Sequence, residues 1–342
     1  MKARQSHVPC KGGSSLRFSA FAVAEAATTE SNRYTCDRFG CRLDLRGGGG
    51  KLGGPLNTTP HSPDPDMAVP RPRRRRVVAW GVVGLFVIVA AIVTAGAWTL
   101  PTEGASGRTI TGADRAQPLL GNTLRIATYN IHSGRDVGGH LGLDKTRAAL
   151  VGFDFVGLNE VSASPAVGGK CQVDVLGEQL QMGSLFAPTE RRWFRDDFGN
   201  GLLTRVPVES WIRFGLPSFG ALARRNLTLV RIQIGGHDVN VLITHLGRHE
   251  DRPLQIQAIT QLFLSLQAPA VLMGDLNTQT NDPLLRPLLQ SAGVEDPLAL
   301  KAADSRRIDW ILTRGMRTID AGLKDSGASD HPLAWAELQP LP

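Results

Sequence analysis

An acid and an amide, Asp275 and Asn277, follow the apolar run of residues 268–273 and are separated by a single residue. Side chains of a strand alternate between its two faces, so these polar groups point the same way if strand geometry continues to position 277. An acid and an amide presented together at the carboxyl end of a strand suggest a functional site. Asp, Asn and Gly are also common turn residues, and the segment taken alone favours an ordinary polar turn.

Polar residues also mark the ends of other apolar segments. They are Asn130 after residues 124–129, Glu160 after 154–159, His245 after 241–244, Asp309 in 306–312, and Asp330 with His331 before 333–338. Polar groups at successive strand ends can converge on one pocket. Singly, each fits an ordinary role, such as a turn cap, a solvated loop residue, a partner of Arg306 or Arg307, or a satisfied buried histidine. Their joint placement at strand ends favours a site.

Three of these residues offer hard oxygen donors. The carboxylates of Glu160 and Asp330 and the amide oxygen of Asn130 are ligands suited to Mg²⁺ or Mn²⁺. A divalent ion neutralises a phosphoryl oxygen and stabilises the charge that develops on a leaving oxygen. The donor set could therefore support phosphoester chemistry.

The remaining residues can handle protons. Asp275 could orient or deprotonate a water molecule. His331 could act as a base or as a cationic ligand of phosphate, and Asp309 could fix its tautomer, as the orienting member of a triad does.

The elements that must position these residues alternate between strands and helices from about residue 120 onward. We expect strands at 124–131, 153–158, 201–205, 227–234, 239–244, 269–273, 308–313 and 333–338, and helices at 143–151, 173–182, 252–267 and 282–290. The Gly-Gly-His-Asp sequence between 227–234 and 239–244 is a hairpin signal. Hairpins mixed with helices predict an α/β sandwich with some antiparallel pairing.

The positive charge of the chain is confined to its amino-terminal tail. Residues 1–76 carry 14 Lys and Arg against 6 Asp and Glu, whereas the rest of the chain carries 24 against 25. Residues 1–66 are rich in Gly, Ser, Thr, Pro and Arg, and this composition predicts disorder. The near-neutral globular part weakens any expectation of broad nucleic-acid affinity, which rests on phosphate neutralisation.

Residues 77–97 form an uncharged apolar segment directly after the Arg-rich residues 71–76. Twenty-one residues at helical rise span roughly 31 Å, about the hydrocarbon thickness of a bilayer. Positive charge stays on the cytoplasmic side, so the tail is expected inside and the globular domain outside. We therefore expect a single-pass anchor. The alternative is a cleaved signal sequence with a secreted domain, since residues 95–97 fit a small-x-small cleavage site.

The expected organisation is a basic tail at 1–76, a transmembrane helix at 77–98, a linker at 99–120 and a catalytic domain at 121–342. Met67 precedes the Arg run as a normal start would. We hypothesise that residues 1–66 are a gene-model extension, which an intact-mass measurement would test.

Seven blocks in order give the domain a resemblance to a known family. They are RIATYNIHSG (125–134), LNEV (158–161), GNGLLTR (199–205), VLITHLG (241–247), VLMGDLNT (271–278), RIDWIL (307–312) and SDHPLAW (329–335). The chain resembles the endonuclease/exonuclease/phosphatase superfamily, which includes deoxyribonuclease I-like nucleases, neutral sphingomyelinases and inositol polyphosphate phosphatases. The resemblance implies a four-layer sandwich of two mixed sheets flanked by helices, and Mg²⁺-dependent phosphoester hydrolysis by in-line attack of water.

The resemblance also implies a role for each matching residue. Glu160 would be the principal metal carboxylate, with Asn130 and Asp330 beside it. Asp275 would position or activate water, Asn277 would hold the phosphate, and His331, oriented by Asp309, would bind phosphate or act as a base. His245 would stabilise the pentacovalent phosphorus, and Asn200 matches a common active-site amide.

One position departs from the family pattern. Some nuclease members carry an acid two residues after the first Asn, where this chain has His132, so metal binding or substrate contact could differ. The change is compatible with the NIH-type subgroup of bacterial and lipid-linked members.

The resulting expectation is a membrane-anchored, metal-dependent phosphoesterase acting on a lipid, a small phosphodiester or a nucleic acid. The alternatives are an extracytoplasmic nuclease acting on DNA or RNA and a non-catalytic surface binding protein on the same fold.

Overall fold

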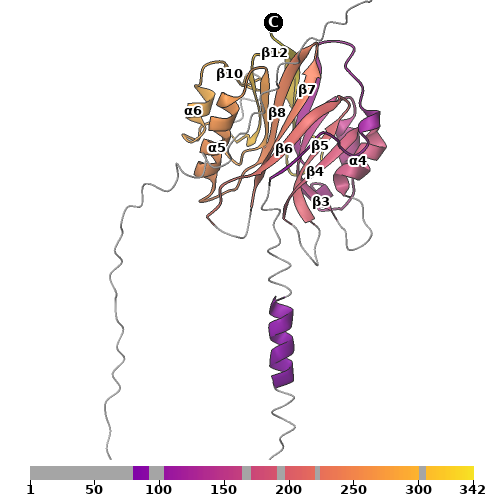
Figure 1. Ribbon diagram of the computed structural model, residues 1–342, viewed down its shortest axis with the longest axis vertical. Coiled ribbons are helices and arrows are strands. Elements are labelled where there is room, and N and C mark those ends of the chain that lie inside the picture. Colours follow the sequence, from indigo (N-terminus) through magenta and orange to yellow (C-terminus); the bar gives the residue numbers. More distant parts are fainter. Residues whose placement is uncertain (1–79, 92–103, 164–170, 191–196, 220–223, 300–305) are drawn as a thin grey trace, which may run out of the picture. The chain divides into compact units, whose positions relative to one another are not determined.

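A computed structural model describes residues 80–91, 104–163, 171–190, 197–219, 224–299 and 306–342. Residues 104–342 of this set form two β-sheets with helices on their outer faces (Figure 1). The seven-stranded sheet has the order β1 (Ala105–Gly107), β6 (Val208–Gly215), β7 (Asn226–Ile234), β8 (His237–His245), β9 (Ala270–Asp275), β11 (Asp309–Arg314) and β10 (Val294–Glu295). The six-stranded sheet has the order β12 (Met316–Lys324), β13 (Leu333–Pro340), β2 (Leu124–Asn130), β3 (Phe155–Ala163), β5 (Asp197–Thr204) and β4 (Gly183–Glu190).

Both sheets are mixed. β2 and β3 run parallel in one sheet, and β8 and β9 run parallel in the other, while the remaining pairings are antiparallel. The carboxyl ends of a parallel pair meet at the same edge of a sheet. Each sheet therefore brings two strand ends together.

Alternation along the strands sorts side chains into separate cores. Ile126 of β2 and Met273 of β9 belong to a cluster between the two sheets. Their neighbours Ala127 and Leu272 face outward, where helices cover them. Helices α3 (Asp144–Leu150) and α4 (Gln172–Leu180) pack on the six-stranded sheet, and α5 (Arg252–Ser265) and α6 (Arg286–Leu289) pack on the other. The predicted α/β sandwich of two mixed sheets flanked by helices is confirmed.

Most elements expected from the sequence are present within two or three residues, and the differences have physical reasons. The expected helix at 282–290 is reduced to α6, because the Asp282 carboxylate accepts the Leu284 N–H at 3.0 Å and holds a turn there. Strands β4, β6 and β12 were not expected. β6 is half-buried for most of its length and lacks a clear apolar alternation. β1 extends the folded domain into the segment expected to be a linker by pairing with β6.

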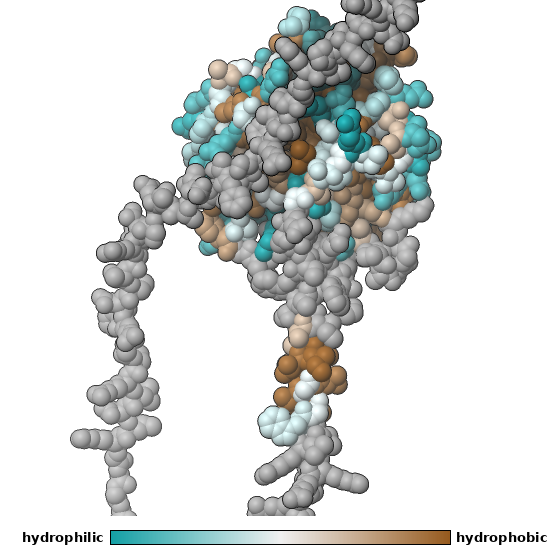
Figure 2. All heavy atoms as spheres, in the orientation of Figure 1, coloured by the Kyte–Doolittle hydropathy of each residue, from teal (hydrophilic) through white to brown (hydrophobic). Residues whose placement is uncertain are grey.

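Residues 80–91 form a helix whose apolar side chains are exposed (Figure 2), with Trp80 and Phe86 each 74% accessible. In the described part of the chain, no helix has the length and apolar content needed to cross a membrane. The predicted span 77–97 extends past these residues at both ends, and the tail at 1–76 lies outside the described residues.

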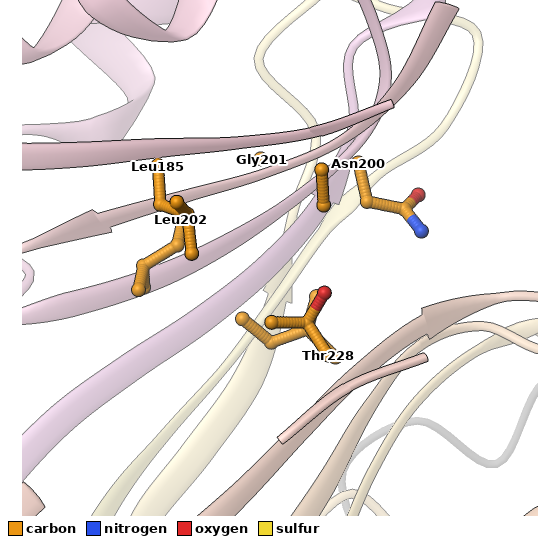
Figure 3. Close-up of a pocket in the computed structure, with 7 residues that line it drawn as sticks. Leu185, Asn200, Gly201, Leu202 and Thr228 are labelled. Carbon is orange, nitrogen blue, oxygen red and sulfur yellow. The ribbon is translucent and has the colours of Figure 1, made fainter. Parts of the chain in front are cut away.

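Thr228 of β7 has a buried hydroxyl in the core between the sheets. Figure 3 shows it reaching toward Leu185, Leu202 and Asn200 of the six-stranded sheet. Its Oγ1 has no hydrogen-bond partner among the described residues, and the space around it does not admit a water molecule. An unsatisfied buried hydroxyl is destabilising by about 1–3 kcal/mol.

We expect Thr228→Val to raise the free energy of unfolding by about 1 kcal/mol, because valine has the same shape without the unsatisfied hydroxyl. Urea denaturation measures the change. Thr244→Val on the neighbouring strand is the matched control, since the Thr244 hydroxyl donates to the Asn226 carbonyl at 3.0 Å. It should lower the free energy of unfolding by a similar amount. A shift of the same sign in both variants would contradict this account.

Candidate active site

Three adjacent strands of the seven-stranded sheet bring an imidazole and two carboxylates side by side. His245 ends β8 and is in register with Asp275, which ends β9, and Asp275 is in register with Asp309, which begins β11. From the opposite sheet, Asn130 at the end of β2 donates from Nδ2 to Asp275 Oδ2 at 3.2 Å. The predicted convergence of polar strand ends is therefore present, and it occurs where the two sheets meet.

The turn after β9 does not continue the strand. Asn277 adopts a φ of 48°, and its backbone N–H donates to Asp275 Oδ1 at 2.8 Å. Strand geometry therefore does not continue to position 277, since the strand ends at Asp275, and the condition for the alternation argument is not met. The Asn277 side chain is held by other contacts: Nδ2 donates to the Leu246 carbonyl at 2.8 Å, and Oδ1 accepts from Arg248 Nε at 3.2 Å.

Asp309 and His331 form a tight pair. His331 Nδ1 lies 2.7 Å from Asp309 Oδ2, and His331 Nε2 lies 4.0 Å from Asp275 Oδ2. Burial lowers the pKa of His331, but the hydrogen bond and charge of Asp309, with the charges of Asp275 and Asp330, outweigh it and raise the pKa to about 9. His331 is therefore an imidazolium at neutral pH and presents its Nε2–H toward Asp275.

Of the two arginines suggested as alternative partners of Asp309, Arg307 is engaged elsewhere. Arg307 pairs with Asp296 at 2.5 Å, and its guanidinium stacks over the Trp310 ring at 4.1 Å. Asp309 takes no part in the Arg307–Asp296 ion pair, and its carboxylate contacts His331 instead.

Asp275 is fully buried, and burial raises its pKa to about 7 with help from the charge of Asp309. The charge of His331, the Asn277 N–H and the Asn130 amide oppose this shift. A carboxyl group with a pKa close to neutrality can accept and release a proton at the working pH.

His245 is buried and neutral, and its tautomer is fixed. Arg225 Nη1 lies 3.2 Å from His245 Nδ1, and because a guanidinium only donates, Nδ1 must accept. The proton is therefore on Nε2. Burial keeps the pKa well below its usual value, and the charges of Arg225, His331 and Arg248 lower it further.

The His245 Nε2–H is an open donor. Nε2 lies 3.4 Å from Asp275 Oδ2, and it has no hydrogen-bond partner in the part of the chain that the structure describes. A buried donor without a partner is costly, so its presence points to an acceptor supplied by a ligand.

A chain of buried asparagines links this centre to the opposite sheet. Asn159 Oδ1 accepts the Asp275 backbone N–H at 2.9 Å, and Asn159 Nδ2 donates to the Thr244 carbonyl at 3.0 Å and to Asn200 Oδ1 at 2.9 Å. Asn200 Nδ2 in turn donates to Asn226 Oδ1 at 2.9 Å. Asn200 thus lies two hydrogen bonds from Asp275, and its role as a substrate contact stays a prediction.

Sequence reasoning missed Asn159, Asn226, Arg225 and Arg248 as parts of this network. Asn159 had a detectable signal, because it follows an apolar run within its strand and buried amides need partners. Asn226 begins β7, and its position gave a weaker signal. Arg225 and Arg248 had none, since an arginine in a loop is ordinarily solvated.

Glu160 occupies a strained position one residue beyond Asn159. Its φ of 56° falls in the left-handed region, where the pairing of β3 with β5 shifts register. Such a conformation costs about 1–3 kcal/mol and is typical of functional sites. The half-buried Glu160 carboxylate makes no hydrogen bond or ion pair among the described residues.

The other two predicted metal ligands lie near the end of β2. Asn130 is in register with Asn159, and its Oδ1 accepts the His132 N–H at 3.0 Å, which leaves one lone pair. His132 Nδ1 lies 3.5 Å from Asp330 Oδ1, and the Asp330 side chain is 56% exposed. Glu160, Asn130 and Asp330 therefore retain oxygen lone pairs that fit a hard divalent ion.

Ligand atoms of Asp275, Asp309 and His331 also lie within 4.8 Å of one another, a spacing that could hold a metal ion. A pKa of about 9 leaves protons on both nitrogens of His331 at neutral pH. A metal ion would have to displace one of these protons and compete with the 2.7 Å contact between His331 Nδ1 and Asp309 Oδ2, so this trio fits proton transfer and anion binding at least as well.

Comparison with known proteins agrees with this picture. A family model described as the Endonuclease/Exonuclease/phosphatase family matches residues 127–331, more than half of the chain. A crystal structure of an endonuclease/exonuclease/phosphatase from Beutenbergia cavernae is 24% identical with a TM-score of 0.53, and the match covers 64% of this chain and 72% of that one. A family protein from Leptotrichia buccalis is 16% identical with a TM-score of 0.52, covering 63% and 99%. These structures share the fold.

We expect Asn159→Ala to lower the free energy of unfolding by about 3 kcal/mol, because it leaves the Asp275 N–H, the Thr244 carbonyl and Asn200 Oδ1 without their partner. Asn240→Ala is the matched control. Asn240 is also a buried strand amide, and its Nδ2 donates to the Gln267 carbonyl at 3.0 Å. It should cost about 1 kcal/mol. Equal losses of unfolding free energy in the two variants, measured by urea denaturation, would contradict the importance of the amide chain for stability.

Proposed function

Since the chain belongs to the Endonuclease/Exonuclease/phosphatase family, we propose that it is a membrane-anchored phosphoesterase that cleaves a phosphodiester or phosphomonoester by in-line attack of water. It is a metal-dependent hydrolase acting on phosphoester bonds. The observation that supports the proposed roles best is the open Nε2–H of the neutral His245, which lies beside a titratable Asp275.

Asp275 holds the attacking water and accepts its proton, a role that suits a buried carboxylate with a pKa of about 7. His331, kept cationic and oriented by Asp309, binds a phosphoryl oxygen. The His245 Nε2–H donates to the phosphoryl group as negative charge builds in the transition state. Asn277 holds the phosphate from the turn beside Asp275, and its amide is oriented by Leu246 and Arg248.

Glu160, Asn130 and Asp330 would hold the divalent ion, for which we propose Mg²⁺ or Mn²⁺ because the donors are oxygens. When bound, such an ion neutralises a phosphoryl oxygen and stabilises the leaving oxygen. His132, which contacts both Asn130 and Asp330, would orient these two ligands or contact the substrate.

We expect Asp275→Ala and His331→Ala each to lower kcat/KM for bis-p-nitrophenyl phosphate by at least ~10²-fold in the presence of Mg²⁺ or Mn²⁺. Each loses a group that meets the water or the phosphate. The matched controls are Asp238→Ala and His237→Ala, which change the same residue types at the start of β8, the opposite end from His245. Both controls should keep the wild-type rate. Equal rates in all the proteins would refute the assignment of the site.

The non-catalytic alternative is tested by the same preparation. A binding protein on this fold would show no hydrolysis in the wild type or in any variant. A calorimetric titration with Mn²⁺ then measures whether the oxygen donors still bind an ion.

We also propose that residues 77–97 anchor the protein in the cell membrane, with the amino terminus cytoplasmic and the catalytic domain outside. The support is the uncharged apolar segment after the Arg run, together with the helical conformation of residues 80–91.

The full-length protein is expected to remain in the membrane fraction after alkaline carbonate extraction, because an apolar span is released only by detergent. Protease added to intact spheroplasts should remove the catalytic domain while a cytoplasmic marker survives. Deletion of residues 77–97 should release the protein in soluble form. An intact mass that corresponds to a mature protein starting at position 98 would contradict the anchor and show that residues 77–97 belong to a cleaved signal sequence.

A further inference from the structure

A polar groove opens directly beside the reaction centre. It has a volume of about 460 Å³ and is lined by Arg252, Asn277, Gln279, Asn281, Asp282, Pro283 and Ile308. Asn277 belongs to the turn that follows Asp275, and Ile308 immediately precedes Asp309. The groove and the site therefore share a wall, and a group bonded to a phosphorus atom at the site can extend into the groove.

The groove carries balanced charge. Its cation and anion face each other, with Arg252 Nη2 3.5 Å from Asp282 Oδ2. Arg252 Nη1 also donates to the Asn277 carbonyl at 2.6 Å, which ties the pair to the turn. A nucleic-acid backbone needs an excess of positive charge, so this lining does not favour a polyanion.

The remaining polar groups are amides with open hydrogen-bonding capacity. The side chains of Gln279 and Asn281 are exposed and make no hydrogen bond among the described residues. An amide offers both a donor and an acceptor, and a hydroxyl group uses both. Pro283 and Ile308 add an apolar surface against which carbon atoms can pack.

The segment that carries these amides is held in place by hydrogen bonds of Thr278. Thr278 lies between Asn277 and Gln279, and its carbonyl accepts the indole N–H of the buried Trp310 at 2.8 Å. Its hydroxyl donates to the Leu276 carbonyl at 2.7 Å. A wall held in this way requires little ordering when a ligand binds.

We propose that this groove binds one of the alcohol groups esterified to the substrate phosphorus, and that this group is uncharged and rich in hydroxyls, such as a glycerol, inositol or monosaccharide unit. The inference rests on the proposed phosphoesterase function and names the substrate class. The volume is within the range of small-molecule sites, roughly 300–1,000 Å³.

The test compares phosphates that differ only in the alcohol. The full-length protein in detergent is titrated calorimetrically with methyl phosphate, glycerol 3-phosphate, myo-inositol 1-phosphate and a dinucleotide, in the presence of Mg²⁺. We expect the hydroxyl-bearing phosphates to bind at least ~10-fold more tightly than methyl phosphate, a difference equivalent to about 1.4 kcal/mol. In the Gln279→Ala/Asn281→Ala variant this ratio should fall to roughly 2-fold, since the amides that bind hydroxyls are gone.

Methyl phosphate serves as the internal reference, because its methyl group carries no hydroxyl for the groove amides to bind. Gln233→Ala is the control variant, since Gln233 is an exposed amide on β7 outside the groove and the site. It should keep the wild-type ratio and the wild-type rate on bis-p-nitrophenyl phosphate.

Equal affinity for methyl phosphate and the hydroxyl-bearing phosphates would overturn the inference, as would an unchanged ratio in the double variant. Tightest binding of the dinucleotide, weakened steeply by salt, would overturn it in favour of a nucleic acid. Failure of the proposed function has a separate signature, namely phosphates that bind without any hydrolysis of bis-p-nitrophenyl phosphate.

Discussion

Asn159 is the point at which the two sheets are held in register around the reaction centre. Its single amide engages the Asp275 N–H, the Thr244 carbonyl and Asn200 Oδ1, so it joins β3 to strands β8 and β9 of the opposite sheet and to β5 of its own. Apolar packing between sheets is non-directional and tolerates sliding. A buried amide does not, because each lost hydrogen bond is destabilising by about 1–3 kcal/mol. The amide chain therefore selects one relative position of the sheets, and that position places Asn130 within 3.2 Å of Asp275.

The same arrangement explains how several ionisable groups share a buried site. Asp309 and His331 neutralise each other as an ion pair, and His245 stays uncharged. Asp275 is then the group whose charge is not fully balanced, and its burial, with the charge of Asp309, raises its pKa to about 7. A site built in this way can take up one negative phosphoryl group and one proton without further rearrangement of its charges.

Much of this site could be predicted from the sequence. The convergence of the polar strand ends followed from the position of polar residues after apolar runs, and the Asp309–His331 pair matches the suggested orienting role of Asp309. The left-handed turn at Asn277 did not, because a strand pattern gives no sign of where the strand stops. The same limit applies to β6, whose half-buried residues show no alternation. It also applies to Arg225, because its effect on the His245 tautomer depends on a contact between the residue that precedes β7 and the end of β8.

One residue shows how closely the backbone of the fold and the chemistry of the site depend on each other. Gly274 adopts a φ of 143°, and a Cβ atom there would lie 1.8 Å from the Thr244 carbonyl oxygen. Any side chain at this position would force β9 away from β8. That movement would separate His245 from Asp275, which are in register across this strand pair, and it would disturb the bridge that Asn159 forms between the Thr244 carbonyl of β8 and the Asp275 N–H of β9. The glycine between Met273 and Asp275 is therefore required by the close approach of two strands, and the geometry of the site follows from that approach.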